Sequence, residues 1–241
     1  MKNQIVLRPI YWASVSGGKD SLYMLKLILD HPELYQLDGV VHFELELDFP
    51  FIKNVIDYMQ AECEQRGIKF VRIRPSVKWI DLYNKLGYPS NKVRWCRDRY
   101  KLDAKHQLEK FLKSNNQYLV SYIGYCKDEV KRYQNNPNDI YPVVDFEIEE
   151  REILEWAKKQ PIFNDYYIIN TRCGCMGCPL SRKMNWAYLY KYYPDYYNEI
   201  LNLMRKSELL WPQAKYDTAD YIDHIVKTKW LDRLNNILLS L

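Results

Sequence analysis

A pair of glycines between a strand-like run and a helix-like run most constrains the fold of this chain. The segment Ile10–Leu22 reads IYWASVSGGKDSL, so that an apolar, β-prone run leads into Gly17 and Gly18 and a helical pattern follows. Glycine has no Cβ, and two of them allow a sharp turn and a close approach of a ligand to the backbone. The first N–H groups of a helix have no partner within it and attract anions. The segment therefore predicts a phosphate-binding loop.

The polar side chains of this loop suit the same role. Two serines supply hydroxyls, Lys19 supplies a cation, and Asp20 is placed to cap the helix. A plain strand–turn–helix would not need these side chains. The loop is not the Walker type, because that motif requires a glycine where Ala13 stands. We take Lys19 and Asp20 as candidate catalytic residues. The candidate nucleotide contacts in this region are Ser14, Ser16, Gly17, Gly18, Lys19, Asp20 and Ser21.

The residues after the loop alternate between strand-like and helix-like patterns. Strands are expected at 39–45, 69–74, 118–124 and 141–144. Helices are expected at 22–30, 51–66, 77–87, 102–112 and 149–159. Strand–helix alternation predicts right-handed crossovers and a parallel sheet. The expected fold class is α/β, with a mostly parallel five-stranded sheet, flanking helices and a C-terminal helical part. The phosphate loop would then lie at the carboxyl end of a strand, where open α/β sheets bind ligands.

The sequence changes character near residue 160. Asn, Asp, Tyr and Gly replace the alternating pattern there, and helical patterns follow at 183–192, 195–207 and 218–239. We therefore expect a nucleotide-binding α/β domain over 1–160 and a cysteine-containing loop with a helical region over 161–241. The aromatic residues of the helical region are explained by interior packing better than by a base-stacking surface.

Composition sets the broad class. A chain of 241 residues with a net charge of +4 suits one domain with an appendage, and the mild charge is compatible with an anionic nucleotide. No apolar run approaches the roughly 20 residues that span a bilayer, and the start of the chain does not look like a signal peptide. We expect a cytoplasmic enzyme without membrane contact. Its six cysteines then indicate ligands or catalytic thiols rather than disulfides.

Three cysteines lie within six residues as C-x-C-x-x-C, with glycines between them that allow the chain to fold around a metal. The proline after the last cysteine is typical of iron–sulfur ligand runs. Cys96 is the candidate fourth ligand, because a helix start flanked by arginines favours a thiolate. The candidate metal ligands are Cys96, Cys173, Cys175 and Cys178. For Cys63 and Cys126 we expect simple burial. The basic run from Arg94 to Lys101 suits either a solvated helix face or a grip on a phosphate.

The SGGKDS sequence of Ser16–Ser21 resembles the PP-loop of the adenine-nucleotide α-hydrolase superfamily. That group includes ATP pyrophosphatases, tRNA-thiolating enzymes, sulfate adenylyltransferase small subunits and phosphoadenosine phosphosulfate (PAPS) reductases. Cys96 and the pair Cys175 and Cys178 match the cysteine positions of PAPS-reductase-like proteins. The resemblance implies an adenine-nucleotide α-hydrolase-like fold. It also implies chemistry at the α-phosphate of ATP with Mg²⁺, or binding of an adenylylated sulfate (PAPS or APS) without ATP cleavage.

The resemblance also bears on the metal. In adenylyl-sulfate reductases, two adjacent cysteines and a C-x-x-C pair hold a [4Fe-4S] cluster. Here Trp95 replaces the first of the adjacent cysteines and Cys173 is additional, so that the count of four is kept while the ligand geometry differs. Relatives in DNA phosphorothioation systems also carry clusters. The resemblance therefore implies a [4Fe-4S] cluster, with zinc as the alternative.

A second segment resembles the Gly…Asp-Glu…Arg segment that lies near the nucleotide in PAPS-reductase-like proteins. Its matching residues are Gly124, Asp128, Glu129 and Arg132. A carboxylate here could hold Mg²⁺, and the arginine could pair with a phosphate or sulfate. An acidic helix start followed by a solvated basic turn would explain the same residues.

The expected function is that of an enzyme of the PAPS reductase family that uses ATP to activate a substrate for sulfur transfer. A cysteine-bound metal centre and a sulfur donor or redox protein as partner belong to this expectation. Sulfonucleotide reductases attack with a cysteine on a C-terminal tail, whereas no cysteine follows Cys178 here. Two alternatives stay open. One is a sulfonucleotide reductase or sulfotransferase with rearranged thiols, and the other is a non-catalytic module that binds a nucleotide or nucleic acid.

Overall fold

The computed structural model of the chain describes residues 6–132, 136–210 and 217–240. The chain divides into two units. The first comprises Met1–Leu45, Pro50–Pro75 and Asp103–Asn164, and the second comprises Glu46–Phe49, Ser76–Leu102 and Asp165–Leu241. The segment Ser76–Leu102, which carries Cys96, thus groups with the C-terminal helices although it lies in the first half of the sequence.

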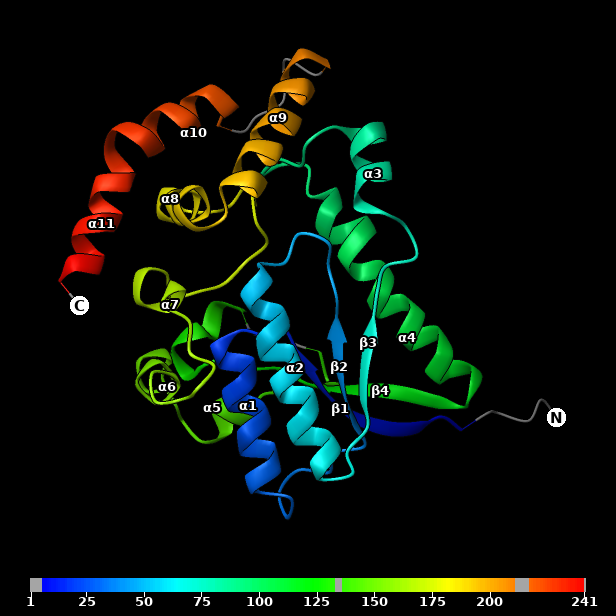
Figure 1. The fold of residues 1–241 in the computed structure, drawn as a ribbon. Coiled ribbons are helices and arrows are strands. Elements are labelled where there is room, and N and C mark those ends of the chain that lie inside the picture. The colour runs from blue at the N-terminus through cyan, green and yellow to red at the C-terminus, as the bar shows by residue number, and fades with distance from the viewer. Residues whose placement is uncertain (1–5, 133–135, 211–216, 241) are drawn as a thin grey trace. The chain divides into compact units, whose positions relative to one another are not determined.

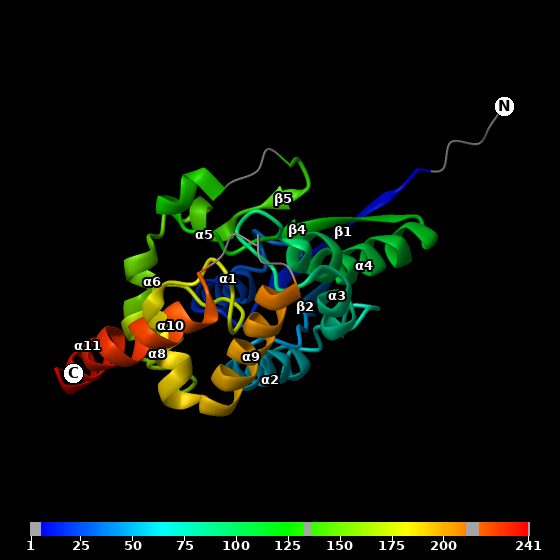
Figure 2. The ribbon, with the colours of Figure 1, turned by 90° about the horizontal axis from the view of Figure 1, so that it is seen from above.

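A five-stranded parallel sheet forms the centre of the first unit. Its strands are β1 Arg8–Val15, β2 Gly39–Phe43, β3 Phe70–Ile73, β4 Gln117–Tyr122 and β5 Asp139–Ile140. Their order is β3-β2-β1-β4-β5, and every pairing is parallel. Strand β1 is central, with Trp12 beside Gly39 of β2 and Arg8 beside Gln117 of β4. The predicted α/β class and parallel sheet are confirmed, and Figure 2 shows β5 beyond β4 at the sheet edge.

The expected strand over 141–144 is wrong. Residues Pro142–Asp145 form the short helix α5, and the last strand is Asp139–Ile140 just before it. Proline has no N–H to donate to a strand ladder, whereas the first turn of a helix leaves that N–H without a partner anyway. Pro142 therefore favours the start of a helix.

Helices cover both faces of the sheet. The first unit contains α1 Lys19–Asp30, α2 Pro50–Gln65, α4 Leu102–Ser114 and α6 Glu150–Ala157. Leu108 and Leu112 of α4 pack against Trp12 and Val41 of the sheet. Helices α1 and α2 follow β1 and β2, so right-handed crossovers place both on the opposite face. They lie side by side in Figure 1 and together line one groove. Helices α5 and α6 pack against α1.

The second unit is helical. Its elements are α3 Trp79–Leu86, the π-helical turn η1 Cys96–Lys101, α7 Tyr166–Ile169, α8 Lys183–Tyr192, α9 Pro194–Leu210, α10 Ala219–Ile225, the π-helical η3 Val226–Trp230 and α11 Leu231–Leu239. Aromatic side chains fill its interior. Tyr166 is fully buried and packs edge-on against Tyr188 and beside Phe49. Throughout the described ranges, every helix is too short or too polar to span a bilayer.

Candidate functional site

The loop between β1 and α1 turns at Gly17. Its φ is +74°, a conformation that side chains other than glycine rarely adopt. A Cβ at this position would also lie 2.7 Å from Cγ2 of Ile52 in α2. Gly18 has an extended backbone with φ −79° and forms the N-cap of α1. The turn predicted from the glycine pair is thus present, and Gly17 alone of the two has a positive φ.

The two serines of the loop hold it together. The Ser21 hydroxyl donates to the carbonyl oxygen of Gly18 at 2.9 Å, and the backbone N–H of Ser16 donates to the Ser21 oxygen at 3.2 Å. The two hydroxyl oxygens lie 3.3 Å apart. Ser14 is half-buried in β1, just before the loop. The hydroxyls therefore shape the loop around the start of α1.

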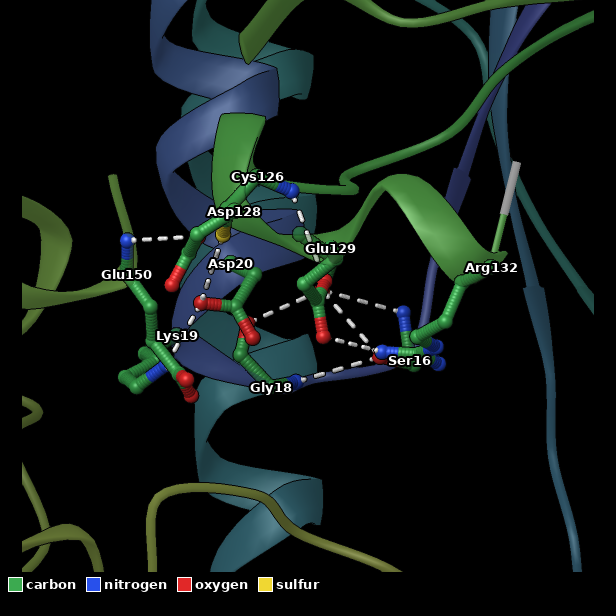
Figure 3. Close-up of polar contacts among 10 residues, drawn as sticks. Ser16, Gly18, Lys19, Asp20, Cys126, Asp128, Glu129, Arg132 and Glu150 are labelled. Atoms are coloured by element: carbon green, nitrogen blue, oxygen red, sulfur yellow. Dashed lines mark hydrogen bonds and ion pairs between the residues drawn. The ribbon is translucent and has the colours of Figure 1, made fainter. Parts of the chain in front are cut away.

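Lys19 places a buried positive charge at this turn. The residue is 3% exposed, and its ammonium donates to Asp20 Oδ1 at 2.6 Å and to Glu150 Oε1 at 3.0 Å. Burial by itself lowers the pKa of Lys19, but the two carboxylates outweigh burial and raise that pKa above its ordinary value. The ammonium is therefore charged at neutral pH, and Figure 3 shows it between the two carboxylates.

Asp20 does not cap α1, contrary to the expectation from the sequence. The N-cap is Gly18, which has no side chain to cap the helix, while the Asp20 carboxylate lies in the first helical turn and accepts from the Lys19 ammonium. Burial raises the pKa of the Asp20 carboxyl, and Lys19 acts against this rise. The Asp20 carboxylate bonds to the charged Lys19 ammonium rather than to the backbone N–H groups of the helix start, because a hydrogen bond between two charged groups is the stronger one.

Gly124 brings the end of β4 against the same turn. A Cβ at Gly124 would lie 2.8 Å from the carbonyl oxygen of Asp20 and 3.1 Å from Cα of Ser21. Strands β1 and β4 are neighbours, yet the chain leads from β1 to β2 on one side and from β4 to β5 on the other. Ligands of open α/β sheets bind at such a switch point. The first candidate segment and Gly124 therefore meet at the expected place.

The two acidic residues after Gly124 lie at this site, and each of them accepts a hydrogen bond. They belong to the 3₁₀ turn η2 Lys127–Arg132. Glu129 is 5% exposed and accepts from Arg132 Nη1 at 2.6 Å. Asp128 is exposed and accepts from the backbone N–H of Glu150 at 3.2 Å. Arg132 also lies 4.5 Å from the ring centre of Tyr125. The structure thus brings Gly124, Asp128, Glu129 and Arg132 to one sheet end with the loop.

Two residues of this region were not site candidates in the sequence. Glu150, the first residue of α6, holds Lys19 from 131 positions away. Acidic residues are common at helix starts because they interact with the helix dipole and form capping boxes. The position of Glu150 in the sequence therefore did not indicate a role at the site. Cys126 is fully buried as expected, and its thiol lies 3.7 Å from Asp20 Oδ1. Burial and the nearby carboxylates raise the pKa of this thiol.

The four candidate metal ligands all lie in the second unit. Cys96 begins η1, and the other three lie in the loop between α7 and α8. All four are free and half-buried. Burial and then Cys178 raise the pKa of Cys96, with Arg94 acting against the rise, and burial raises the pKa of Cys175 to about 12. At Cys96 the effect of burial is stronger than that of Arg94, so the direction of its pKa shift is opposite to the one that the helix start and arginines predicted.

The cysteine loop is fixed at one end and has space at the other. Gly177 has φ +65°, and a Cβ there would lie 2.5 Å from the Tyr88 hydroxyl and 2.6 Å from Ile200. That hydroxyl donates to the Gly177 carbonyl oxygen. Met176 N–H donates to the carbonyl oxygen of Leu47 at 2.8 Å. Around Gly174, by contrast, no atom of the described residues other than its two chain neighbours lies within 4 Å of a Cβ position.

Within residues 6–132, 136–210 and 217–240, no three His, Cys, Asp or Glu side chains are placed together to hold a metal ion. The four thiols nevertheless share one electrostatic neighbourhood, since Cys96 acts on Cys175, Cys178 acts on both, and Cys175 acts on Cys173. Four sulfur donors are the ligand chemistry of iron–sulfur and zinc sites. The donor set therefore fits a thiolate-bound metal in kind, although the sulfur atoms are not arranged as a ligand set.

The family follows from the sequence. A profile of the phosphoadenosine phosphosulfate reductase domain matches residues 10–162, which is more than half of the chain. The chain belongs to this family, as the resemblance of its loop and cysteines implied. No curated protein matches it. Among solved structures, the U34-tRNA thiolase NcsA from Methanococcus maripaludis, with its [4Fe-4S] cluster, is similar. It is 18% identical, the match covers 94% of this chain and 75% of that chain, and the TM-score is 0.40.

Proposed function

We propose that the chain is an enzyme that binds ATP at Ser16–Ser21 and activates a substrate for sulfur transfer, with a cysteine-bound metal centre in its second unit. The observation that carries this proposal is the buried, charged Lys19 at the switch point of the sheet. Keeping an ammonium out of water is costly unless partners hold it. Two carboxylates hold this one at a turn built for an anion, which supports a role in binding phosphate.

Each residue of the loop would have a distinct task toward MgATP as substrate. Lys19 and the start of α1 would stabilise negative charge on the phosphates, since fixed donors act most strongly where water is excluded. Asp20 and Glu150 would keep the ammonium in place. Arg132 would offer a second cation for a phosphate or sulfate, and Asp128, which is exposed, would offer an oxygen ligand for Mg²⁺.

The proposed activation takes place at the α-phosphorus. An oxygen of the acceptor attacks this phosphorus, the bond to the bridging oxygen breaks, and pyrophosphate leaves with the electron pair. The acceptor then carries an adenylyl group that a sulfur nucleophile can displace as AMP. Lys19 would act on the charge that develops on the phosphate oxygens.

The metal centre would be held by Cys96, Cys173, Cys175 and Cys178. A bound iron–sulfur cluster would supply redox-active iron and sulfide, and we favour it over zinc because of the ligand spacing and Pro179. The open space around Gly174 leaves this end of the loop free to adjust, while Tyr88 and Ile200 fix Gly177.

Nucleotide chemistry is tested by ATP binding and pyrophosphate release. We expect the wild type to bind ATP, and Lys19→Ala to release pyrophosphate about 100-fold more slowly. Lys26→Ala is the matched control, because Lys26 lies on the same helix and is exposed and paired with Asp30. Tight PAPS binding without ATP binding would favour the sulfonucleotide reductase or sulfotransferase alternative. ATP binding without turnover would favour a binding module.

The metal is tested by anaerobic purification with iron and zinc analysis and ultraviolet–visible spectra. We expect about four iron atoms per chain and a brown protein. Cys96→Ser should lose the metal, whereas Cys63→Ser, at a fully buried position in α2, should keep it. A colourless protein with stoichiometric zinc would contradict the cluster.

A further inference from the structure

The thiol of Cys126 lies beside the phosphate loop, and the proposed nucleotide chemistry does not use it. Cys126 is fully buried within the first unit, two residues after the close approach of Gly124 to α1. Its sulfur lies 3.7 Å from Oδ1 of Asp20, within the range of a hydrogen bond that involves sulfur. An ionised carboxylate only accepts hydrogen bonds, so the proton of this bond comes from the thiol.

The surroundings of Cys126 favour the protonated thiol. Burial raises its pKa above the ordinary value, the charges of Asp20 and Glu129 raise it further, and Lys19 acts against the rise. The thiolate is the nucleophilic form of cysteine, so a buried thiol of this kind is inert. Cys126 is therefore suited to donate a hydrogen bond and not to carry sulfur.

The oxygen that accepts from Cys126 is also the one that holds Lys19. Oδ1 of Asp20 accepts from the Lys19 ammonium at 2.6 Å and from the Cys126 thiol at 3.7 Å. The bond between the two charged groups is much the stronger one. The thiol thus restricts the direction of the carboxylate without drawing it away from the ammonium, whereas a second cation in its place would compete with Lys19.

Two hydrogen bonds to Glu129 hold the backbone of Cys126. The Cys126 N–H donates to Glu129 Oε2 at 3.4 Å, and the Glu129 N–H donates to the carbonyl oxygen of Cys126 at 3.0 Å. The other carboxylate oxygen of Glu129 accepts from Arg132 Nη1 at 2.6 Å. Cys126 therefore connects the Glu129–Arg132 pair of η2 with the Lys19–Asp20 pair of α1, as Figure 3 shows.

The position of Lys19 depends on such contacts. Its ammonium sits on a flexible four-carbon chain, so the carboxylates that accept from it decide where it lies. A charge stabilises a transition state best when it is fixed before the reaction begins. A donor that limits the rotation of the Asp20 carboxylate therefore also limits the movement of the ammonium.

We infer that Cys126 is a positioning residue whose thiol donates a hydrogen bond to Asp20 Oδ1 and thereby helps to fix the Lys19 ammonium at the loop. Its effect on turnover rests on the proposed function, whereas the hydrogen bond itself does not. The experiment accordingly has one part that requires ATP and two parts that do not.

The first part is infrared spectroscopy of the S–H stretching band, with the full chain purified anaerobically. Difference spectra of the wild type against Cys126→Ala and against Cys63→Ala isolate the band of each thiol. Cys63 is the matched control, because it is equally buried and only burial and charged residues beside it in the sequence act on its pKa. A hydrogen bond weakens the S–H bond, so the Cys126 band should lie at the lower wavenumber. Asp20→Asn, which weakens the acceptor, should shift the Cys126 band upward and leave the Cys63 band in place.

The second part is a double-mutant cycle measured by urea unfolding. The effects of Asp20→Asn and Cys126→Ala on the urea midpoint should not add in the double variant, because residues in contact are coupled. The effects of Asp20→Asn and Cys63→Ala should add. Cys63 lies about two turns further along α2 than Ile56, which borders Gly17, and so lies away from the loop.

The third part separates turnover from binding. Cys126→Ala removes the donor and should slow pyrophosphate release about fivefold, while ATP affinity stays within about twofold of the wild type. Cys126→Ser restores a donor and should bring the rate to within about twofold of the wild type. Cys63→Ala should leave both the rate and the affinity unchanged. A merely structural role of Cys126 would produce neither this division nor the rescue by serine. Circular dichroism melting verifies that each variant is folded.

The inference is overturned if the two S–H bands coincide and Asp20→Asn moves neither, or if Cys126→Ala releases pyrophosphate at the wild-type rate. Equal losses of rate in Cys126→Ala and Cys126→Ser, together with additive midpoints, would assign Cys126 to packing and overturn it as well. Failure of the proposed function is recognised separately. A wild type that releases no pyrophosphate contradicts ATP activation, and the infrared bands and the double-mutant cycle then still decide whether Cys126 holds Asp20.

Discussion

The ammonium of Lys19 and the carboxylate of Glu150 form a 3.0 Å ion pair between residues that lie 131 positions apart in the sequence. The pair joins the first turn of α1 to the first residue of α6. This pair holds a buried charge at the sheet end where a nucleotide is expected. Figure 3 shows that the Asp20 carboxylate also contacts the Lys19 ammonium. Glu150 is therefore a positioning residue for Lys19.

Glu150→Gln should separate binding from turnover. The substitution keeps the shape of the side chain and removes a negative charge that opposes phosphates, so ATP should bind several-fold more tightly. Lys19 loses one of its carboxylate partners, and pyrophosphate release should slow about tenfold. Calorimetric titration and a pyrophosphate assay measure the two effects. Glu155→Gln, an exposed position on α6 paired with Lys158, should change neither. If Glu150→Gln also changes neither, the positioning role is wrong.

Gly124→Ala should disturb the site through the backbone. The new methyl group would meet the carbonyl oxygen of Asp20 at 2.8 Å, and neither backbone can yield without moving the start of α1. We expect the free energy of unfolding to fall by about 1–3 kcal/mol and ATP binding to weaken. Gly174→Ala is the control for stability, since open space surrounds that position and the change should stay within about 0.5 kcal/mol. Equal urea midpoints for the two variants would contradict the close approach.

Tyr88→Phe should loosen the cysteine loop. The Tyr88 hydroxyl donates to Gly177, whereas the similar hydroxyl of Tyr83 donates to the carbonyl oxygen of Leu203 in α9. Each loss leaves a carbonyl oxygen without this donor and should lower the free energy of unfolding by about 1–2 kcal/mol. Only Tyr88→Phe should also weaken metal binding, by about tenfold. Metal content after dialysis against a chelator measures this difference, and an equal content in Tyr83→Phe would contradict it.

Ionisation of the buried Cys63 thiol should lower the free energy of unfolding at alkaline pH. Burial raises the pKa of this thiol from 9.0 to about 11. Below pH 9 the thiol is protonated in the folded and unfolded states, so its contribution is fully present. Between pH 9 and 11 the unfolded state loses the proton first, and the free energy of unfolding falls by up to about 3 kcal/mol. Cys63→Ala lacks this proton and should show a smaller fall. Urea unfolding at several pH values tests the prediction, which parallel curves for the two proteins would refute.

The nearby parts of the site could be predicted because their causes are local. Gly17 turns the chain between a strand and a helix, and Ser16, Lys19 and Ser21 all lie within four residues of it. The parallel sheet followed from the alternation of patterns. The expected strand at 141–144 failed because its apolar residues fit a strand and a helix equally, and Pro142 decided for the helix.

The sequence by itself thus determined the strand–turn–helix loop at Gly17 and Gly18, the parallel sheet, the four thiols and, through the profile over residues 10–162, the family. The tertiary structure decided what surrounds them. It placed Glu150 beside Lys19 and Gly124 against Asp20, raised the pKa of the Cys96 thiol through burial, and left the buried side-chain amide of Asn170 without a partner among the described residues. These facts depend on burial and on contacts between distant segments, and neither is encoded in the spacing of neighbouring residues.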